Sequence, residues 1–202
     1  MVHYCHPMAD LADRSLSDLL SEVAAPSPAP GGGCSVGWTC AIAAGLVEMA
    51  AEITLAREVR ASLGKTSHRA RELRAEAVAL AERELHAYEP VLLALRLPKT
   101  DPGRAERLDA ALSEAAETPV ALARCATEIA ALAAELGSSA TRHVQGDAIA
   151  GLLLAEGAAQ AAARLARINL AGRPEDERLT ELSELTTRSA KLRDEVLSAG
   201  RN

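Results

Sequence analysis

Apolar residues recur along most of the chain at the spacing of an α-helix. One such run is Val36, Cys40, Ala43 and Val47. Intervals of three or four residues place such side chains on one helical face. The same periodicity predicts six helices, at about 15–25, 33–63, 66–97, 104–136, 142 or 146 to 170, and 175–199. Because long helices with short connections are typical of bundles, we predict an all-α fold: an antiparallel bundle of about six helices, several of them long and alanine-rich.

Residues that start or stop helices mark the ends of these elements. Ser15 is a favourable N-cap for the first helix. Three prolines at alternate positions within 25–33 cannot continue that helix. Gly64, within the segment 62–65, predicts the end of the second helix, and the Gly-Ser-Ser segment at 137–139 predicts a later break.

Two prolines fall inside predicted helices. Pro90 and Pro119 each remove a backbone donor and therefore predict a kink. No connection is long enough to separate two domains. We expect residues 1–14 to form a flexible lead-in and residues 15–202 to form a single helical domain.

The composition supports helices and limits the possible core. Aromatic residues make up 1% of the chain, with no Phe at all, so Leu, Val, Ile and Ala must fill the interior. Alanine has the highest helix propensity and lets helices pack closely. Residues that favour strands are scarce.

The charge and the cysteine pattern exclude several classes of function. A formal net charge of −6 argues against nonspecific binding of nucleic acid, which needs a basic surface. The N-terminus lacks the basic and apolar segments of a signal peptide. The small-residue stretch 41–51 is too short to span a membrane, and Glu48 and Glu52 interrupt its extension. We expect a cytoplasmic protein that does not bind membranes.

No metal site is predicted. The four cysteines contain no Cys-x-x-Cys pair, so we expect reduced thiols used as small apolar residues. His3, Cys5 and His6 are metal-ligand types, but they lack a fourth ligand.

The segment 25–33, which reads Ala-Pro-Ser-Pro-Ala-Pro-Gly-Gly-Gly, is the most irregular part of the sequence. Three glycines let a backbone approach a ligand closely. The free N–H groups at the start of the following helix favour an anion or a carbonyl oxygen. The segment is therefore either a ligand-binding loop or a tight connection. Cys34 at the helix start is either a thiol of lowered pKa or a small residue that fills space.

Three acidic or amide residues are further candidates. Glu84 shares a helical face with Tyr88, and a carboxylate in a pocket can act as a general acid or base. The alternative is a solvated charge on an exposed face. Asp147 and Asn169 lie near predicted helix ends, where capping is their ordinary role.

Several motifs in one order resemble the formiminotransferase-cyclodeaminase C-terminal family. The resemblance is collinear and covers about 15–171. It rests on Pro-Ala-Pro-Gly-Gly-Gly-Cys-Ser at 28–35, Ala87-Tyr88, Leu97-Pro98-Lys99, Arg104, Pro119-Val120, Asp147 and Ile168-Asn169-Leu170.

The resemblance implies a homodimeric all-helical protein that acts on folates. The implied activity is that of a methenyltetrahydrofolate cyclohydrolase or a formiminotetrahydrofolate cyclodeaminase. It needs no cofactor beyond the tetrahydrofolate substrate. Glu84 is implied as the catalytic carboxylate that transfers protons. The implied substrate-binding residues are Gly31, Gly32, Gly33, Cys34, Arg57, Lys99, Arg104, Asp147 and Asn169.

Three positions depart from the family pattern. Glu84 stands where Asp is usual, Cys34 replaces Ser, and Leu165 replaces a common Asn. The extra methylene moves the carboxylate by about 1.5 Å, and a misplacement of that size can reduce a rate about 10²-fold. The alternative is therefore a divergent, non-catalytic homodimer that binds folate or another protein on the same scaffold.

Overall fold

The computed structural model describes residues 14–27, 30–57 and 61–199, and these residues contain helices and turns but no strand. They form eight helices: α1 Leu16–Val23, α2 Gly32–Leu55, α3 Ala61–Ala87, α4 Glu89–Arg96, α5 Arg104–Ala115, α6 Glu117–Ser139, α7 Gln145–Asn169 and α8 Glu177–Ala199. The predicted all-α bundle is confirmed. Since α3 with α4 and α5 with α6 each correspond to one predicted helix, the count of about six also holds.

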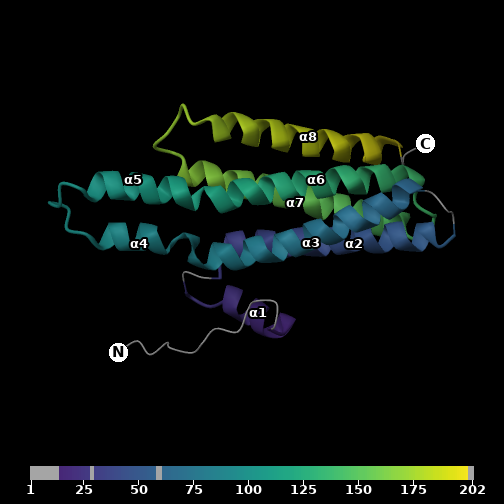
Figure 1. Cartoon of the computed structure of the whole chain (residues 1–202), viewed down its shortest axis with the longest axis horizontal. Helices are drawn as coiled ribbons and strands as arrows, with labels where there is room; N and C mark the ends of the chain where they lie inside the picture. Colours follow the sequence, from purple (N-terminus) through teal and green to yellow (C-terminus); the bar gives the residue numbers. More distant parts are fainter. Residues whose placement is uncertain (1–13, 28–29, 58–60, 200–202) are drawn as a thin grey trace.

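Four long helices, α2, α3, α6 and α7, make the centre of the bundle (Figure 1). Each is antiparallel to the next one along the chain. Helix α8 packs along α6 and α7, α1 lies apart beside the start of α2, and α4 and α5 project together from one end of the molecule.

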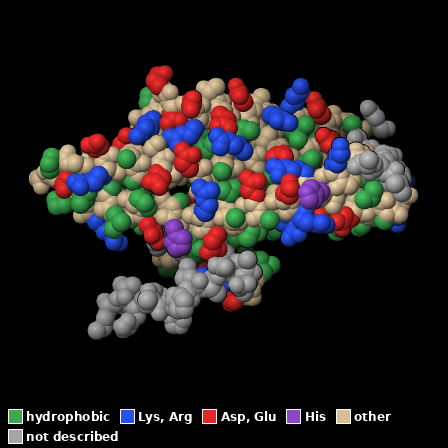
Figure 2. Space-filling view, viewed as in Figure 1, with side chains coloured by type: hydrophobic (Ala, Val, Ile, Leu, Met, Phe, Trp, Pro, Cys, Tyr) green, Lys and Arg blue, Asp and Glu red, His purple; other side chains and the backbone are tan. Residues whose placement is uncertain are grey.

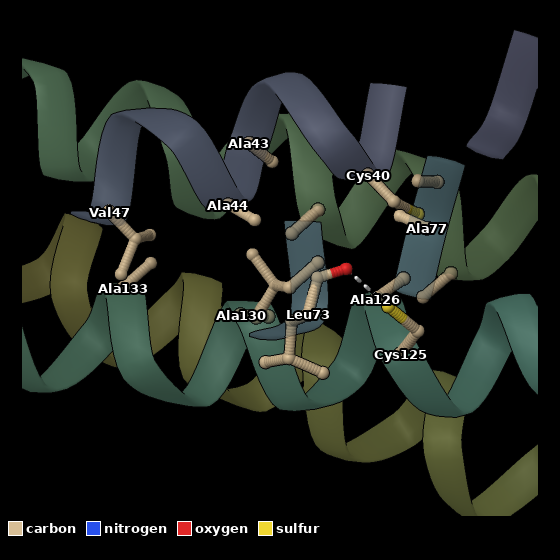
Figure 3. Close-up of a cluster of buried hydrophobic side chains, with 14 of the residues drawn as sticks. Cys40, Ala43, Ala44, Val47, Leu73, Ala77, Cys125, Ala126, Ala130 and Ala133 are labelled. Atoms are coloured by element: carbon tan, nitrogen blue, oxygen red, sulfur yellow. Dashed lines mark hydrogen bonds between the residues drawn. The ribbon is translucent and has the colours of Figure 1, made fainter. Parts of the chain in front are cut away.

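Small side chains dominate the core between α2, α3 and α6. In Figure 3, Cys40, Ala43, Ala44 and Val47 of α2 face Leu73 of α3 and the alanines of α6. The apolar run predicted from the sequence, Val36, Cys40, Ala43 and Val47, is buried throughout. At Gly37 the helices come so close that a Cβ atom would lie 2.7 Å from Cβ of Ala81. Small residues therefore set the spacing of α2 and α3.

Capping and proline signals located several boundaries correctly. The Ser15 hydroxyl accepts a hydrogen bond from the Asp18 N–H at 3.1 Å, which makes Ser15 the N-cap of α1. The predicted kinks at Pro90 and Pro119 are confirmed as breaks, at Tyr88 between α3 and α4 and at Ala116 between α5 and α6.

The break predicted at Gly64 is wrong. Gly64 lies inside the first turns of α3, and α2 already ends at Leu55. The buried positions of α2 stop at Thr54 and those of α3 begin at Leu63, so packing sets the boundary. The break predicted at 137–139 is placed correctly, since α6 ends at Ser139, but Gly137 itself still lies inside the helix, where the Gln145 side-chain amide donates to its carbonyl at 2.8 Å. A glycine costs a helix only about 1 kcal/mol, and tertiary contacts outweigh that penalty.

Helices α2 and α7 are long and apolar enough to cross a membrane by length and composition alone, so the prediction that Glu48 and Glu52 leave the apolar stretch of α2 too short is wrong by that test. Half of the apolar window in each helix is buried inside the bundle. Their position in the core accounts for their apolar character.

Candidate functional site

The Glu84 carboxyl of α3 lies directly against Gly33 in the first turn of α2. A Cβ atom at Gly33 would lie 2.1 Å from Oε1 of Glu84, far inside van der Waals contact. The two residues meet because α2 and α3 are antiparallel, which brings the start of one helix beside the end of the other. The missing side chain of Gly33 therefore makes the space that the carboxyl occupies.

The start of α2 offers backbone donors to this space. Gly31 is the N-cap and supplies no side chain to the first turn. Its carbonyl accepts from the N–H of Ser35 at 3.1 Å and from the Ser35 hydroxyl at 3.0 Å. The N–H groups of a first helical turn have no partner within their helix, and they favour negative charge. The Gly31–Cys34 segment can therefore hold an anion or a carbonyl oxygen.

Burial controls the charge of Glu84. It raises the pKa of this carboxyl from 4.5 to about 7. Its buried Oε2 atom accepts no hydrogen bond from any residue that the structure describes. A carboxyl with a pKa close to neutrality can both take up and release a proton at physiological pH, which is the property required of a proton shuttle.

The same shift makes the stability of the protein depend on pH. Between about pH 4.5 and 7 the folded chain holds a proton on Glu84 that the unfolded chain has lost, so this contribution to stability is complete below pH 4.5 and is lost as the pH rises through 7. We expect Glu84→Gln to raise the Tm at pH 8 by about 2–8 °C, for a gain of about 1–2 kcal/mol. At pH 4.5 the Tm should change little. Thermal unfolding at the two pH values measures the difference, and an equal change at both would contradict it.

Cys34 forms part of an apolar wall beside the carboxyl. It is buried in a cluster with Ala81 and Leu85, against which Leu19 of α1 and Trp38 pack. Of the two roles left open for Cys34, the environment does not favour a thiol of lowered pKa: burial, and to a lesser extent the charge of Glu84, raise the pKa of Cys34, although the backbone at Gly31 opposes the change. The alternative role, a small residue that fills space, agrees with this environment.

Two of the predicted basic residues lie at the tip of the α4–α5 projection. Lys99 is exposed in the loop between α4 and α5. The Arg104 Nε atom donates to the Leu97 carbonyl at 3.2 Å, which secures that loop. Eight residues of α4 separate this loop from the Glu84 end of α3, a rise of about 12 Å. Both cations are therefore on the Glu84 side of the molecule but outside contact with its carboxyl.

Arg57 and Asp147 lie in the other half of the molecule. Arg57 follows the last turn of α2, whereas Gly33 belongs to its first turn. The 24 residues of α2 rise about 36 Å. Asp147 is in the first turn of α7, which runs antiparallel to α2 and brings Leu165, near its other end, beside Gly32. The single chain thus unites the glycines, Cys34 and Glu84 but keeps Arg57 and Asp147 apart from them.

The Asn169 side chain is engaged in a structural contact. Its Nδ2 atom donates to the carbonyl of Ala115 at 3.0 Å. Pro119, four residues after Ala115, has no N–H with which to make the usual helical bond to that carbonyl. Asn169 supplies the missing donor at the break between α5 and α6.

Sequence reasoning did not place three apolar residues at the site, although it named Leu165 as a departure from the family pattern. Leu19 and Trp38 pack beside Cys34, and the methyl groups of Leu165 would lie 3.9 Å from a Cβ at Gly32. The apolar spacing within 15–25 indicates that Leu19 is inward-facing, but nothing local indicates which helix it contacts. The predicted metal-ligand types His3, Cys5 and His6 lie outside the described residues, as does all of the predicted lead-in except Arg14.

Comparisons with known proteins place these features in a family. The family described as formiminotransferase-cyclodeaminase matches residues 15–188. Methenyltetrahydrofolate cyclohydrolase from Methylorubrum extorquens is 28% identical over 196 residues, which cover 91% of this chain and 94% of that protein. Formimidoyltransferase-cyclodeaminase from Mus musculus is 32% identical over 120 residues, which cover 57% of this chain and 22% of that protein.

A solved structure has the same fold. The crystal structure of formiminotetrahydrofolate cyclodeaminase from Thermotoga maritima matches with a TM-score of 0.76 over 92% of each chain, at 22% identity. The resemblance indicated by the order of the motifs is thus confirmed, over a segment that includes the glycine turn, Glu84 and the last core helix. The chain belongs to the formiminotransferase-cyclodeaminase family.

Proposed function

We propose that the protein is a folate-dependent enzyme of one-carbon metabolism, either a methenyltetrahydrofolate cyclohydrolase or a formiminotetrahydrofolate cyclodeaminase, with Glu84 as its proton shuttle. The observation that carries this proposal is the Glu84 carboxyl, with a pKa raised to about 7, held against the open first turn of α2. Membership of the family supplies the class of substrate.

The proposed chemistry needs one proton carrier. Methenyltetrahydrofolate has a cationic carbon between two nitrogens. Water adds to this carbon, Glu84 takes one proton from the water and passes it to the nitrogen whose bond to carbon then breaks, and the remaining hydroxyl proton leaves to solvent as the formyl C=O forms. In cyclodeamination the second folate nitrogen attacks the formimino carbon and closes the ring, and the proton that it loses is carried to the nitrogen that leaves as ammonia. Because the cation belongs to the substrate and the carboxyl stabilises it, we propose no cofactor beyond tetrahydrofolate.

Turnover of the two folates tests this function and separates its two forms. Loss of the ultraviolet absorbance of methenyltetrahydrofolate, faster than the spontaneous rate, would identify a cyclohydrolase. Ammonia release from formiminotetrahydrofolate would identify a cyclodeaminase. Binding of tetrahydrofolate by calorimetry with no acceleration of either reaction would instead support the non-catalytic alternative.

We further propose that the protein acts as a homodimer through the face formed by α2 and α7, called here the α2–α7 face. Large apolar side chains are exposed on it: Ile42 is 56% exposed, Leu153 41% and Met49 38%. A groove of about 250 Å³ lies beside them, lined by small residues such as Thr39, Gly157 and Ala161. By contrast, charges of both signs cover the face seen in Figure 2.

A second copy fits the α2–α7 face because the exposed side chains of Ile42, Met49 and Leu153 on one subunit can enter the groove on the other. In a two-fold interface the same patch serves both subunits. Two adjacent helices about 36 Å long and about 10 Å apart present on the order of 700 Å², close to the roughly 800 Å² per partner of a stable interface. A two-fold axis at the midpoint of α2 would place the end of one α2 beside the start of the other. Arg57 of the partner subunit would then approach Gly31–Gly33.

A charge on the α2–α7 face should separate the subunits. We expect Met49→Glu to sediment as a chain of 21.1 kDa while the wild type sediments at twice that mass, since a buried unpaired carboxylate opposes association. Leu93→Glu is the matched control, because Leu93 is 62% exposed on α4, away from the face. Sedimentation velocity measures both, and a Met49→Glu dimer as stable as the wild type would exclude this interface.

A further inference from the structure

Helices α4 and α5 form a hairpin that extends beyond the ends of α2 and α7 (Figure 1). The hairpin has a small core of its own, in which Val91, Ala111 and Ala115 are buried and Leu108 and Leu112 pack against them. This core is separate from the main core of the bundle. The α4–α5 hairpin is therefore a unit that the rest of the protein holds at its base.

The base of the hairpin is broken on both sides. The α3–α4 break is at Tyr88 (φ −96°, ψ −6°) and the α5–α6 break is at Ala116 (φ −80°, ψ −20°). A cleft of about 420 Å³ opens between them, lined by Arg83, His86, Ala87, Pro90, Glu114, Glu117 and Thr118. Since neither helix runs through the base unbroken, other contacts must fix the angle of the hairpin.

Those contacts come from the α7–α8 connection and the first turn of α8, and they act on α5. Arg178, whose side chain is 14% exposed, donates from Nη1 to the Ser113 carbonyl at 2.9 Å and from Nη2 to the Ser113 hydroxyl at 2.8 Å. It also pairs with Glu117 across the break. Arg178 thus joins the last turn of α5 to the first turn of α6.

Two neighbours complete this attachment. Asn169 donates to the Ala115 carbonyl that Pro119 leaves unbonded, and Arg173 pairs with Asp109 at 2.7 Å. Asp176 holds the Arg178 guanidinium at 2.8 and 2.7 Å, and the same pairing lowers the pKa of Asp176 to about 2. The charge of this carboxylate therefore persists throughout the neutral range.

We propose that Arg178 is a positioning residue, which with Asn169 fixes the angle of the α4–α5 hairpin and so places its basic tip relative to Glu84. The one-carbon unit and the glutamate carboxylates of a folate lie on opposite sides of the p-aminobenzoyl group, so a site for both must be extended. Glu84 at the base and Lys99 at the tip lie at two ends of such a site. This link to the substrate rests on the proposed function, whereas the mechanical role of Arg178 does not.

Arg178→Gln tests the positioning role against a purely structural one. We expect amide hydrogen exchange in residues 89–115 to accelerate about tenfold, while α2 and α3 exchange as in the wild type, because local opening needs only the local contacts. The KM for the folate substrate should rise about tenfold with kcat within twofold, as expected when binding contacts alone are lost. Arg178→Lys, which keeps one donor and the charge, should restore part of both.

Arg193→Gln is the matched control. Arg193 also lies on α8 and also binds a buried partner, donating to Glu156 at 2.9 Å, but it is four turns from the hairpin base. We expect it to lower the Tm without changing exchange in 89–115 or the KM. If both variants accelerate exchange alike throughout the chain, the positioning role is excluded.

The readouts separate this proposal from the proposed function. Faster exchange confined to the hairpin, in a protein that turns over no folate, would leave the mechanical role intact and remove the function. Unchanged hydrogen exchange in Arg178→Gln, in a protein that turns over folate, would exclude the mechanical role and leave the proposed function intact. Should Arg178→Gln not fold, Asn169→Leu removes the donor to Ala115 instead, and exchange in 89–115 at the wild-type rate would then overturn the proposal.

Discussion

Replacing Glu84 by Gln should reduce folate turnover by about 10²–10⁴-fold, the usual contribution of a positioned acid or base. Glutamine keeps the size of the side chain against Gly33 but cannot carry a proton between water and nitrogen. Burial alone raises the pKa of Glu84 to about 7. Its Oε2 atom has no hydrogen-bond partner among the described residues, so the proton transfer is assigned to this carboxyl itself. Initial rates from ultraviolet absorbance measure the loss.

Two companion variants sharpen this test. Glu76→Gln alters an exposed carboxylate about two turns earlier on α3 and should change the rate less than about twofold, as surface substitutions generally do little. Glu84→Asp introduces the residue usual in the family and retains a carboxylate, so it should keep more activity than Glu84→Gln. Equal rates for wild type and Glu84→Gln would exclude the proton shuttle.

Local sequence signals predicted a helix break correctly where a single residue is enough to interrupt the backbone hydrogen bonds. Pro90 and Pro119 remove a donor whatever surrounds them, so both breaks were found. Gly64 and Gly137 only weaken a helix, by about 1 kcal/mol each, and the packing of α3 and α6 overcomes that penalty. The spacing of apolar residues likewise predicted the buried face of α2, because helical periodicity alone determines which residues share a side.

The candidate site was predictable only in part, because its residues are far apart in sequence. Gly33 and Glu84 meet through the antiparallel pairing of α2 and α3, and neither local sequence contains that register. Only the resemblance to a family implied that the glycines and Glu84 belong to one site. The sequence left two roles open for Cys34, and what favours the space-filling role is its packing with Ala81 and Leu85 of α3, a tertiary contact. The resemblance implied Asn169 as a substrate-binding residue, with capping of a helix end as its ordinary role; its amide instead donates to Ala115 at the break after α5.

The single chain also leaves a discrepancy that a dimer would remove. Arg57 and Asp147 resemble substrate-binding residues of the family, yet they lie toward the far ends of α2 and α7 from Glu84. No rotation of side chains spans about 36 Å of helix. A second copy on the α2–α7 face reverses the direction of α2 and brings one of these distant ends close, so the location of Arg57 is itself an argument for the proposed homodimer.

Alanine substitutions at two glycines of α2 should have different effects, one on the stability of the fold and the other on activity at the site. Gly37→Ala would place a Cβ 2.7 Å from Cβ of Ala81 and 3.1 Å from the Ala77 carbonyl. Because neither neighbour is the end of a flexible side chain, α2 and α3 must move apart. We expect a loss of about 1–3 kcal/mol from overpacking, only partly offset by the better helix propensity of alanine. Thermal unfolding should then show a Tm lower by several degrees, at about 2–4 °C per kcal/mol.

Gly33→Ala should do the opposite. Its Cβ would meet Oε1, Cδ and Cγ of Glu84 at 2.1–2.3 Å, and that side chain can swing aside, so the Tm should change little. The displaced carboxyl would no longer lie at the start of α2, and a shift of about 1 Å can reduce a rate about 10²-fold. Gly64→Ala, where a Cβ meets nothing within 4 Å, is the control for alanine itself. Full activity in Gly33→Ala would mean that the position of Glu84 against α2 is unimportant, whereas an inactive protein of normal Tm would tie turnover to that contact.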